Sequence, residues 1–340
     1  MRRIAILSLI VLLCLPISAT KRALLIGVGN YPQNSGWQKI SSVNDIVILE
    51  QVLSHDFMIE TLIDQQATRM GIDKAFKRII SNCSKGDTVL IHFSCHGQQL
   101  LSSQQDEPDG LDEALVPYDA NSTKTKTYKG ENHLLDNDLA RYWESIRKRL
   151  GSNGLLVVTL DACYSDSNHK GKNKTDSIIY RGGADIFGSN ELSKDSLIKV
   201  KEMQQKRDES AIESIDDAAN IIIMSACETF QKNREIRIDG QGYGCLSYSM
   251  FKTFESHNIK EITTWLDTVF EYMNEYGYTQ TPQVRSTIGY ISPKQREAKI
   301  SKDNKEPFSE EEKDYKLIIA IGLSLLFILL FAIWKQKRRR

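Results

Sequence analysis

Two side chains that could together attack a carbonyl group, a histidine and a cysteine, each follow a strongly apolar run in this chain. His96 ends the run that begins at Asp87, and Cys163 follows the run that begins at Leu155. The thiolate is the attacking form of cysteine, and a free thiol with a pKa of about 8.5 needs a base to form it at neutral pH. The pair therefore predicts nucleophilic catalysis, with the amides of Gly97 and Cys163 as donors to a developing oxyanion.

Residues of these types also have simpler roles and take part in other chemistries. Taken alone, His96 fits a satisfied core histidine and Cys163 a small buried hydrophobic residue. A metal site on His92, Cys95, His96 and Cys163 lacks a recognised ligand spacing. A C-x5-R phosphatase loop needs arginine where His169 stands. The occurrence of both residues at strand ends favours catalysis.

The elements that must position this pair alternate along the chain. Apolar runs at residues 22–28, 57–62, 155–161 and 221–225, with the run before His96, predict strands. Apolar residues at helical spacing predict helices at 43–53, 68–80, 135–150, 243–254 and 261–276. Strands apolar on both faces, alternating with helices, indicate an α/β fold with a mostly parallel sheet covered on both sides. Such sheets carry their sites beyond the carboxyl ends of the strands, where His96 and Cys163 lie.

The two ends of the chain predict export and anchoring. Residues 1–19 have a basic start, an apolar stretch and a small residue at Ala19, which is typical of a signal peptide. Residues 317–334 are apolar and uncharged, long enough for a transmembrane helix, and the basic tail 335–340 is expected on the cytoplasmic side. The catalytic domain is then extracytoplasmic, either periplasmic or extracellular.

The remaining composition limits the function further. Lysine plus arginine number 44 and aspartate plus glutamate 44, so no nucleic-acid partner is indicated. Between residues 20 and 290 we expect one domain, interrupted by a long polar, mobile linker at about 165–206, and residues 291–316 form a polar stalk. Removal of the signal peptide leaves five cysteines, an odd number with no C-x-x-C motif. A Cys95–Cys163 disulfide is a hypothesis for an inactive state in an oxidising exterior.

Several segments, in order, resemble boxes of the caspase-like cysteine peptidases (peptidase family C14), and of metacaspases in particular. They are residues 23–31, 43–45, 94–97, 109–119, 161–165 and 224–227, the last followed by Gln231 and Glu235. The resemblance covers about residues 21–290, and ordered boxes are more specific than any single motif. Cys95, Ala162 and Tyr164 depart from the usual Gly, Ser and His.

The resemblance implies a caspase–hemoglobinase sandwich with a mostly parallel six-stranded sheet, followed by the transmembrane helix. It implies His96 as general base and Cys163 as nucleophile in peptide-bond hydrolysis. Asp45 and Asp161 would line an acidic pocket that selects Arg or Lys before the cut. From local sequence alone, Asp45 reads as a helix N-cap and Asp161 as a loop cap.

The resemblance also bears on regulation. The acidic loop offers oxygen ligands for calcium at Asp109, Asp112 and Asp119, although a solvated loop explains it equally well, and no cofactor is required by the chemistry. Basic residues in the linker predict self-cleavage by a basic-specific enzyme; they include Lys170, Lys172, Lys174, Arg181 and Lys206.

The sequence thus predicts a membrane-anchored cysteine endopeptidase that acts on proteins or peptides with Arg or Lys at the cut site. The alternative is a caspase-like domain kept for binding or scaffolding, with an idle Cys–His pair. The altered neighbours Cys95 and Ala162 keep that alternative open.

Overall fold

The computed structural model describes residues 19–102, 110–164, 179–182, 185–191, 193, 212, 214–228, 231–256, 261–277, 280–293, 295 and 296. It divides into two units, Met1–Tyr290 and Ile291–Arg340, and the fold described below belongs to the first. The predicted signal peptide, apart from its last residue, and the predicted transmembrane helix lie outside the described residues. Among the residues described, no helix has the length and apolar character needed to cross a membrane.

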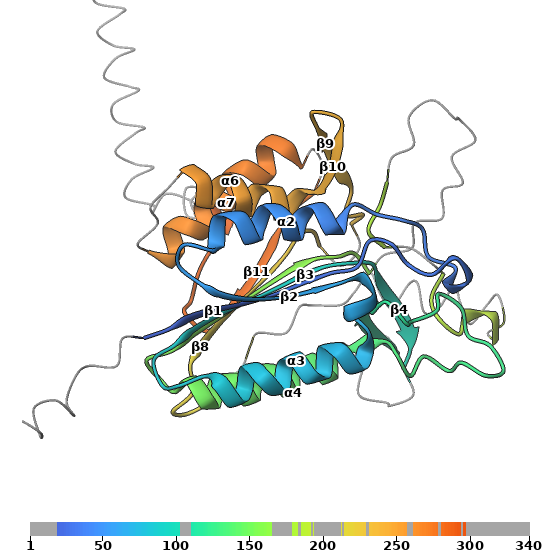
Figure 1. Cartoon of the computed structure of the whole chain (residues 1–340), viewed down its shortest axis with the longest axis horizontal. Coiled ribbons are helices and arrows are strands. Elements are labelled where there is room, and N and C mark those ends of the chain that lie inside the picture. Colours follow the sequence, from blue (N-terminus) through green and yellow to red (C-terminus); the bar gives the residue numbers. More distant parts are fainter. Residues whose placement is uncertain are drawn as a thin grey trace, which may run out of the picture. The chain divides into compact units, whose positions relative to one another are not determined.

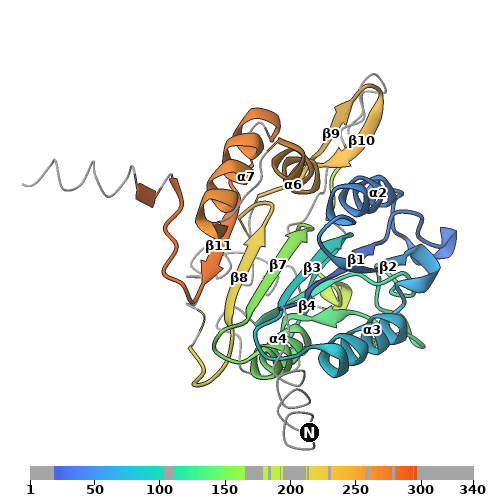
Figure 2. The same cartoon turned by 60° about the vertical axis from the view of Figure 1, so that its left-hand side comes forward.

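A six-stranded sheet forms the centre of the first unit, as Figure 2 shows. Its strand order is β11–β8–β7–β3–β1–β2, with β11 antiparallel to β8 and the other neighbours parallel. The strands are β1 (Lys21–Gly27), β2 (Met58–Ile63), β3 (Thr88–Ser94), β7 (Leu155–Asp161), β8 (Asn220–Ser225) and β11 (Gln283–Ser286). The predicted mostly parallel α/β sheet is confirmed.

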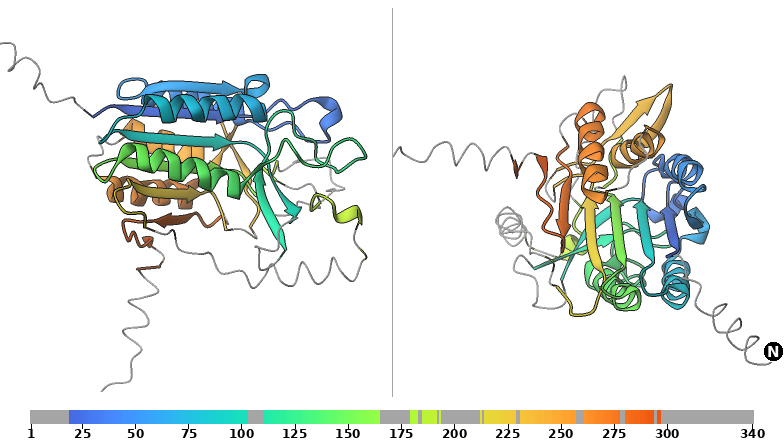
Figure 3. Two further views of the ribbon diagram at one scale, coloured as in Figure 1. Left: turned by 90° about the horizontal axis from the view of Figure 1, so that it is seen from below. Right: turned by 90° about the vertical axis from the view of Figure 1, so that its left-hand side faces the viewer.

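Helices cover both faces of this sheet (Figures 1 and 3). One face carries α2 (Ser42–Leu53), α6 (Cys245–Ser256) and α7 (Ile262–Tyr276), and the other carries α3 (Arg69–Asn82) and α4 (Asp136–Leu150). Successive strand residues point to opposite faces. Accordingly, Leu24 and Ile26 of β1 join the apolar cluster under α3 and α4, whereas Ala23 and Leu25 join the cluster under α2, α6 and α7. Each predicted helix is present, with ends shifted by up to two residues.

Two smaller sheets, which the sequence did not predict, lie near the carboxyl ends of the strands. One is antiparallel and comprises β4 (Gly97–Leu101), β5 (Leu111–Leu115) and β6 (Leu134–Leu135). The other is the hairpin β9 (Glu235–Ile238) and β10 (Gln241–Gly244). Its turn, Asp239–Gly240, has φ values of 50° and 80°, as the two-residue turn of a tight hairpin requires. Three short 3-10 turns complete the described elements: η1 (Gln33–Ser35), η2 (Asp64–Gln66) and η3 (Ser189–Glu191).

Part of the predicted mobile linker is ordered against these sheets. Residues 179–182 and 185–191 are described, and isolated bridges join Gly182 to Gly97, Phe187 to Leu100 and Tyr180 to Arg234. These residues are therefore joined through their backbones to segments on either side, and the mobility of the linker stays a prediction.

Candidate active site

The two central strands place His96 and Cys163 at the same edge of the sheet. Ser94, the last residue of β3, pairs in register with Asp161, the last residue of β7. His96 and Cys163 each follow two residues later, so neighbouring parallel strands carry them to the same level. Each residue is only 2 % exposed.

The ring of His96 is held in one tautomer and protected from water. Its Nε2 lies 2.9 Å from the backbone oxygen of Gln38. A carbonyl oxygen only accepts hydrogen bonds, so Nε2 carries the proton and Nδ1 has a free lone pair. The buried Nδ1 has no hydrogen-bond partner among the described residues. The ring stacks on Trp37 with centroids 4.9 Å apart, and burial lowers the pKa of His96 to about 4. At neutral pH the imidazole is therefore an uncharged base.

The thiol of Cys163 lies against a second thiol. Its Sγ donates to the backbone oxygen of Gln231 at 3.0 Å, and the thiol of Cys227 lies 3.5 Å from the same oxygen. A hydrogen bond with Cys163, together with burial, raises the pKa of Cys227 well above its usual value. None of the five cysteines in the described part of the chain forms a disulfide, and the sulfur beside Cys163 is that of Cys227.

Two backbone amides converge on one carbonyl oxygen of the linker. The amides of Cys163 and Gly97 donate to the oxygen of Arg181 at 3.1 and 3.2 Å. These are the two amides that the sequence analysis named as oxyanion donors. A pair of N–H groups aimed at one carbonyl oxygen can stabilise negative charge that develops on it.

The linker residues on the amino side of this carbonyl are extended along a neighbouring segment. The amide of Arg181 donates to the oxygen of Asn233 at 2.9 Å, and the amide of Glu235 donates to the oxygen of Ile179 at 2.9 Å. Tyr180 between them forms an antiparallel bridge with Arg234. Residues 179–181 are thus paired as a short antiparallel strand with residues 233–235.

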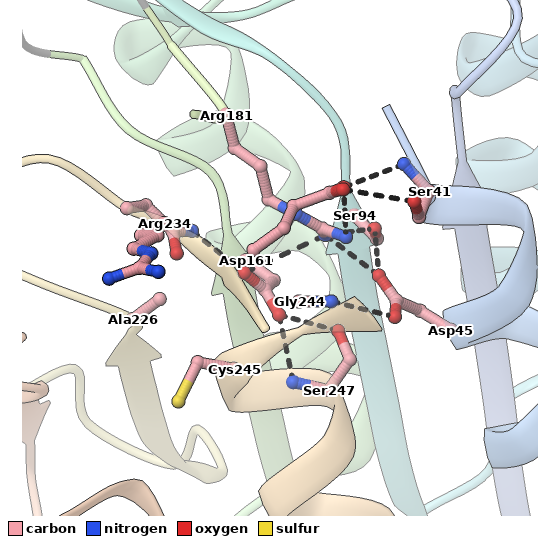
Figure 4. Close-up of polar contacts among 12 residues, drawn as sticks. Ser41, Asp45, Ser94, Asp161, Arg181, Ala226, Arg234, Gly244, Cys245 and Ser247 are labelled. Carbon is pink, nitrogen blue, oxygen red and sulfur yellow. Dashed lines mark hydrogen bonds and ion pairs between the residues drawn. The ribbon is translucent and has the colours of Figure 1, made fainter. Parts of the chain in front are cut away.

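The side chain of Arg181 fills a buried acidic pocket (Figure 4). Nη1 lies 2.7 Å from Asp45 and 3.7 Å from Asp161, and Nη2 lies 3.0 Å from Glu235. Nη1 also donates to Ser94 Oγ at 2.6 Å. The guanidinium is fully buried. Burial opposes its charge, but the three carboxylates raise the pKa of Arg181 above its already high value.

The carboxylates are fixed by further hydrogen bonds. Asp45 accepts from the Gly244 amide at 2.9 Å and from the Ser94 hydroxyl at 2.7 Å. Asp161 accepts from Asn233 Nδ2 at 2.7 Å and from the Ser247 amide and hydroxyl at 2.8 and 2.6 Å.

These surroundings give the two aspartates different pKa values. Burial raises the pKa of Asp45 to about 6, although Arg181 acts against that rise. Burial acts in the same direction on Asp161, but Arg181 and the hydrogen bonds from Ser247 and Asn233 outweigh it and hold the pKa of Asp161 below its usual range. Asp161 therefore keeps its charge more readily than Asp45.

Sequence reasoning missed part of this pocket. Glu235, which contacts the guanidinium directly, was noted only as part of a family box, and it comes from a hairpin that was not predicted. Its carboxylate is held by the Ser41 amide and hydroxyl at 2.6 and 2.9 Å. Arg181 was one of several basic linker residues, and Gln38, which orients His96, carries no sequence signal.

The predicted calcium ligands do not form a described cluster. Asp109 lies outside the described residues, Asp112 is buried in β5, and Asp119 accepts a hydrogen bond from the Arg69 amide at 2.8 Å at the start of α3. Within the part of the chain that the structure describes, no three His, Cys, Asp or Glu residues could hold a metal ion. Calcium binding stays a prediction.

The fold and the site together define the class of protein. A solved structure of protein GSU0716 from Geobacter sulfurreducens has a similar fold, with a TM-score of 0.54 and 20 % identity over 78 % of this chain and 93 % of that one. The family model for the caspase domain, Peptidase_C14, matches residues 20–289, and the chain belongs to this family.

Curated relatives agree with that assignment. Metacaspase-1A of Aspergillus niger is 23 % identical over 78 % of this chain and 69 % of its own length. Metacaspase-1 of Meyerozyma guilliermondii is 24 % identical over 79 % of this chain and 70 % of its own length. The predicted kinship with metacaspases is confirmed, and the protein is a cysteine-type endopeptidase.

Proposed function

We propose that this peptidase cuts on the carboxyl side of arginine or lysine, with Cys163 as nucleophile and His96 as base. The observation that carries the proposal is the position of Arg181. Its carbonyl oxygen accepts from two amides beside Cys163, while its guanidinium pairs with Asp45 and Glu235. A substrate arginine before the scissile bond would need the same two sets of contacts at once.

The chemistry follows from the groups at the carbonyl. The Cys163 thiol leaves its hydrogen bond to Gln231, gives its proton to His96 Nδ1, and attacks the carbonyl carbon. The negative charge that forms on the oxygen is stabilised by the amides of Cys163 and Gly97. The carbon–nitrogen bond then breaks, and the leaving amine takes the proton from Nδ1. Water hydrolyses the thioester, releases the arginine carboxylate and restores the thiol.

The pocket suits arginine in particular. Asp45 and Glu235 contact different nitrogens of one guanidinium, Nη1 and Nη2. A planar fork of donors can satisfy two carboxylates simultaneously, whereas the ammonium of lysine is a compact point charge. In this proposal the pocket accepts both arginine and lysine, and arginine is the better substrate.

The first substrate in this proposal is the chain itself, at the Arg181–Gly182 bond. Residues 179–182 already pair with neighbouring backbone along the site, and the side chain of Arg181 occupies the acidic pocket. Cleavage there would free the new carboxyl terminus at Arg181 to leave and would open the pocket to other substrates.

The test uses the full chain, purified as wild type and as Cys163→Ala, with Cys83→Ala as a control that removes another buried thiol. Mass spectrometry of the termini should find fragments that end at Arg181 and begin at Gly182 in the wild type and in the Cys83→Ala control. Cys163→Ala should stay intact and should also fail to cleave a fluorogenic Ile-Tyr-Arg arylamide. A folded wild type that cuts neither its own chain nor any basic peptide would support the scaffold alternative.

We also propose that the domain is exported and anchored by residues 317–334, with the tail 335–340 in the cytoplasm. The supports are the basic start and apolar stretch of residues 1–19 and the apolar run followed by basic residues at the other end. Protease treatment of intact cells should remove an epitope inserted after Tyr290 and spare one fused after Arg340. The reverse pattern would contradict the orientation.

A further inference from the structure

The residue after the scissile bond is pressed against the backbone of the nucleophile. A Cβ added to Gly182 would lie 2.2 Å from the carbonyl oxygen of Cys163 and 2.9 Å from its carbonyl carbon. These are backbone atoms and cannot swing aside as the end of a side chain can. The same oxygen lies 2.6 Å from the position of a Cβ on Gly97. The Cys163 carbonyl is therefore enclosed by two glycines, Gly97 at the start of β4 and Gly182 in the linker.

The surrounding contacts prevent a simple shift that would make room. Cys163 lies two residues beyond the end of β7, and its own amide donates to the Arg181 oxygen. Gly182 forms a parallel bridge with Gly97, whose amide donates to that oxygen too. Moving Gly182 away from Cys163 would also move the scissile carbonyl away from its two donors.

From this geometry we infer that the site selects glycine immediately after the cut, so that its substrates are Arg–Gly bonds. The inference rests on the proposed cleavage after Arg181 and adds a second specificity determinant to it. The acidic pocket recognises the arginine by charge, and the Cys163–Gly97 backbone excludes side chains at the next residue by contact. Because the excluded atom is a Cβ, alanine is rejected as well as every larger L-residue.

Two isomeric peptides test this directly, Ile-Tyr-Arg-Gly-Ala and Ile-Tyr-Arg-Ala-Gly, with blocked ends. They have equal composition and charge and differ only in which residue follows the arginine. Misplaced or overpacked methyl groups typically reduce kcat/KM by about 10- to 100-fold. We expect the Gly-Ala peptide to be cut faster by that factor. In the full chain, Gly182→Ala should slow the appearance of fragments ending at Arg181 to a similar extent.

An Ile-Tyr-Arg arylamide, which has no amino acid after the arginine, separates the two hypotheses. If it is cleaved and the two peptides are cut at equal rates, the glycine selection is wrong and the proposed function stands. If neither the arylamide nor either peptide is cleaved by folded wild-type protein, the proposed function fails and the glycine selection fails with it.

Discussion

The closest ion pair in the acidic pocket gives the sharpest prediction. Asp45→Asn preserves the size of the side chain and removes one of the three charges around the guanidinium. Asp45 lies 2.7 Å from Nη1, nearer than Glu235 lies to Nη2 and nearer than Asp161. Breaking a buried pair costs about 3–5 kcal/mol. Two carboxylates remain here, so we expect a loss of about 2–3 kcal/mol, which is about 30- to 150-fold in kcat/KM.

The assay is a double-mutant cycle across the enzyme and its substrate. An Ile-Tyr-Arg arylamide is compared with its citrulline analogue, which keeps the shape of arginine without its charge. For wild type, kcat/KM should fall strongly when citrulline replaces arginine. For Asp45→Asn it should fall much less, because the interaction that citrulline removes is already weakened. The coupling free energy should then be about 2–3 kcal/mol. Asp56→Asn, an exposed carboxylate paired with Lys21, is the matched control.

Two results would refute this reasoning. If Asp45→Asn slowed the arginine and citrulline substrates by the same factor, the loss would not arise from the ion pair. If it slowed cleavage of neither substrate, Asp45 would not contribute to recognition of the substrate charge. Urea unfolding of each variant keeps loss of folding apart from loss of recognition.

The other predictions concern pH, oxidation and calcium. Arg181 lowers the pKa of Asp45, which is about 6 with Arg181 in place, so binding an arginine releases a proton. Cleavage of arginine substrates should therefore weaken as pH falls through about 6. His96, with a pKa of about 4, should not cause this loss of activity. The same pH dependence with the uncharged citrulline substrate would argue against a role for Asp45. Mild hydrogen peroxide should oxidise the thiols of Cys163 and Cys227 to a disulfide, with two waters formed. Peptide mapping should find this pair, and a reductant should restore activity. If Cys227→Ser lost activity with peroxide and regained it with reductant to the same extent as wild type, this disulfide would be excluded. If calcium binds the acidic loop, EDTA should lower activity and added calcium should restore it, and equal rates in both conditions would remove calcium from the account.

The sheet could be predicted from the sequence because its signals are local. Runs such as 155–161 are apolar on both faces, which only a strand covered by helices on both sides satisfies. The same rule located the carboxyl ends of β3 and β7, and with them His96 and Cys163. The small strands were missed because they are not apolar runs. β9 contains the charged residues Glu235 and Arg237, β10 contains Gly242 and Gly244, and only Asp239–Gly240 marks the turn.

The pocket was predictable only in part, because its members come from distant segments. Asp45 and Asp161 lie at the start of a helix and the end of a strand, where an open α/β sheet gathers polar groups. Glu235 follows the linker in the sequence, and its position depends on the pairing of β9 with β10 rather than on any periodicity. The hypothesis of a Cys95–Cys163 disulfide likewise considered the thiol that follows β3, whereas the thiol that contacts Cys163 is that of Cys227, which follows β8.

The identity of the linker residue in the pocket shows why charge alone was insufficient. Of the basic residues named in the linker, both Lys170 and Arg181 are followed by glycine, so a rule of a base followed by glycine ranks them equally. The pocket distinguishes them because Asp45 and Glu235 face two separate nitrogens of one guanidinium. An ammonium has a single nitrogen and cannot stand in for both at the same positions. Both residues carry the positive charge that the pocket requires, and the fork of arginine therefore makes Arg181 the residue that this site would cut first.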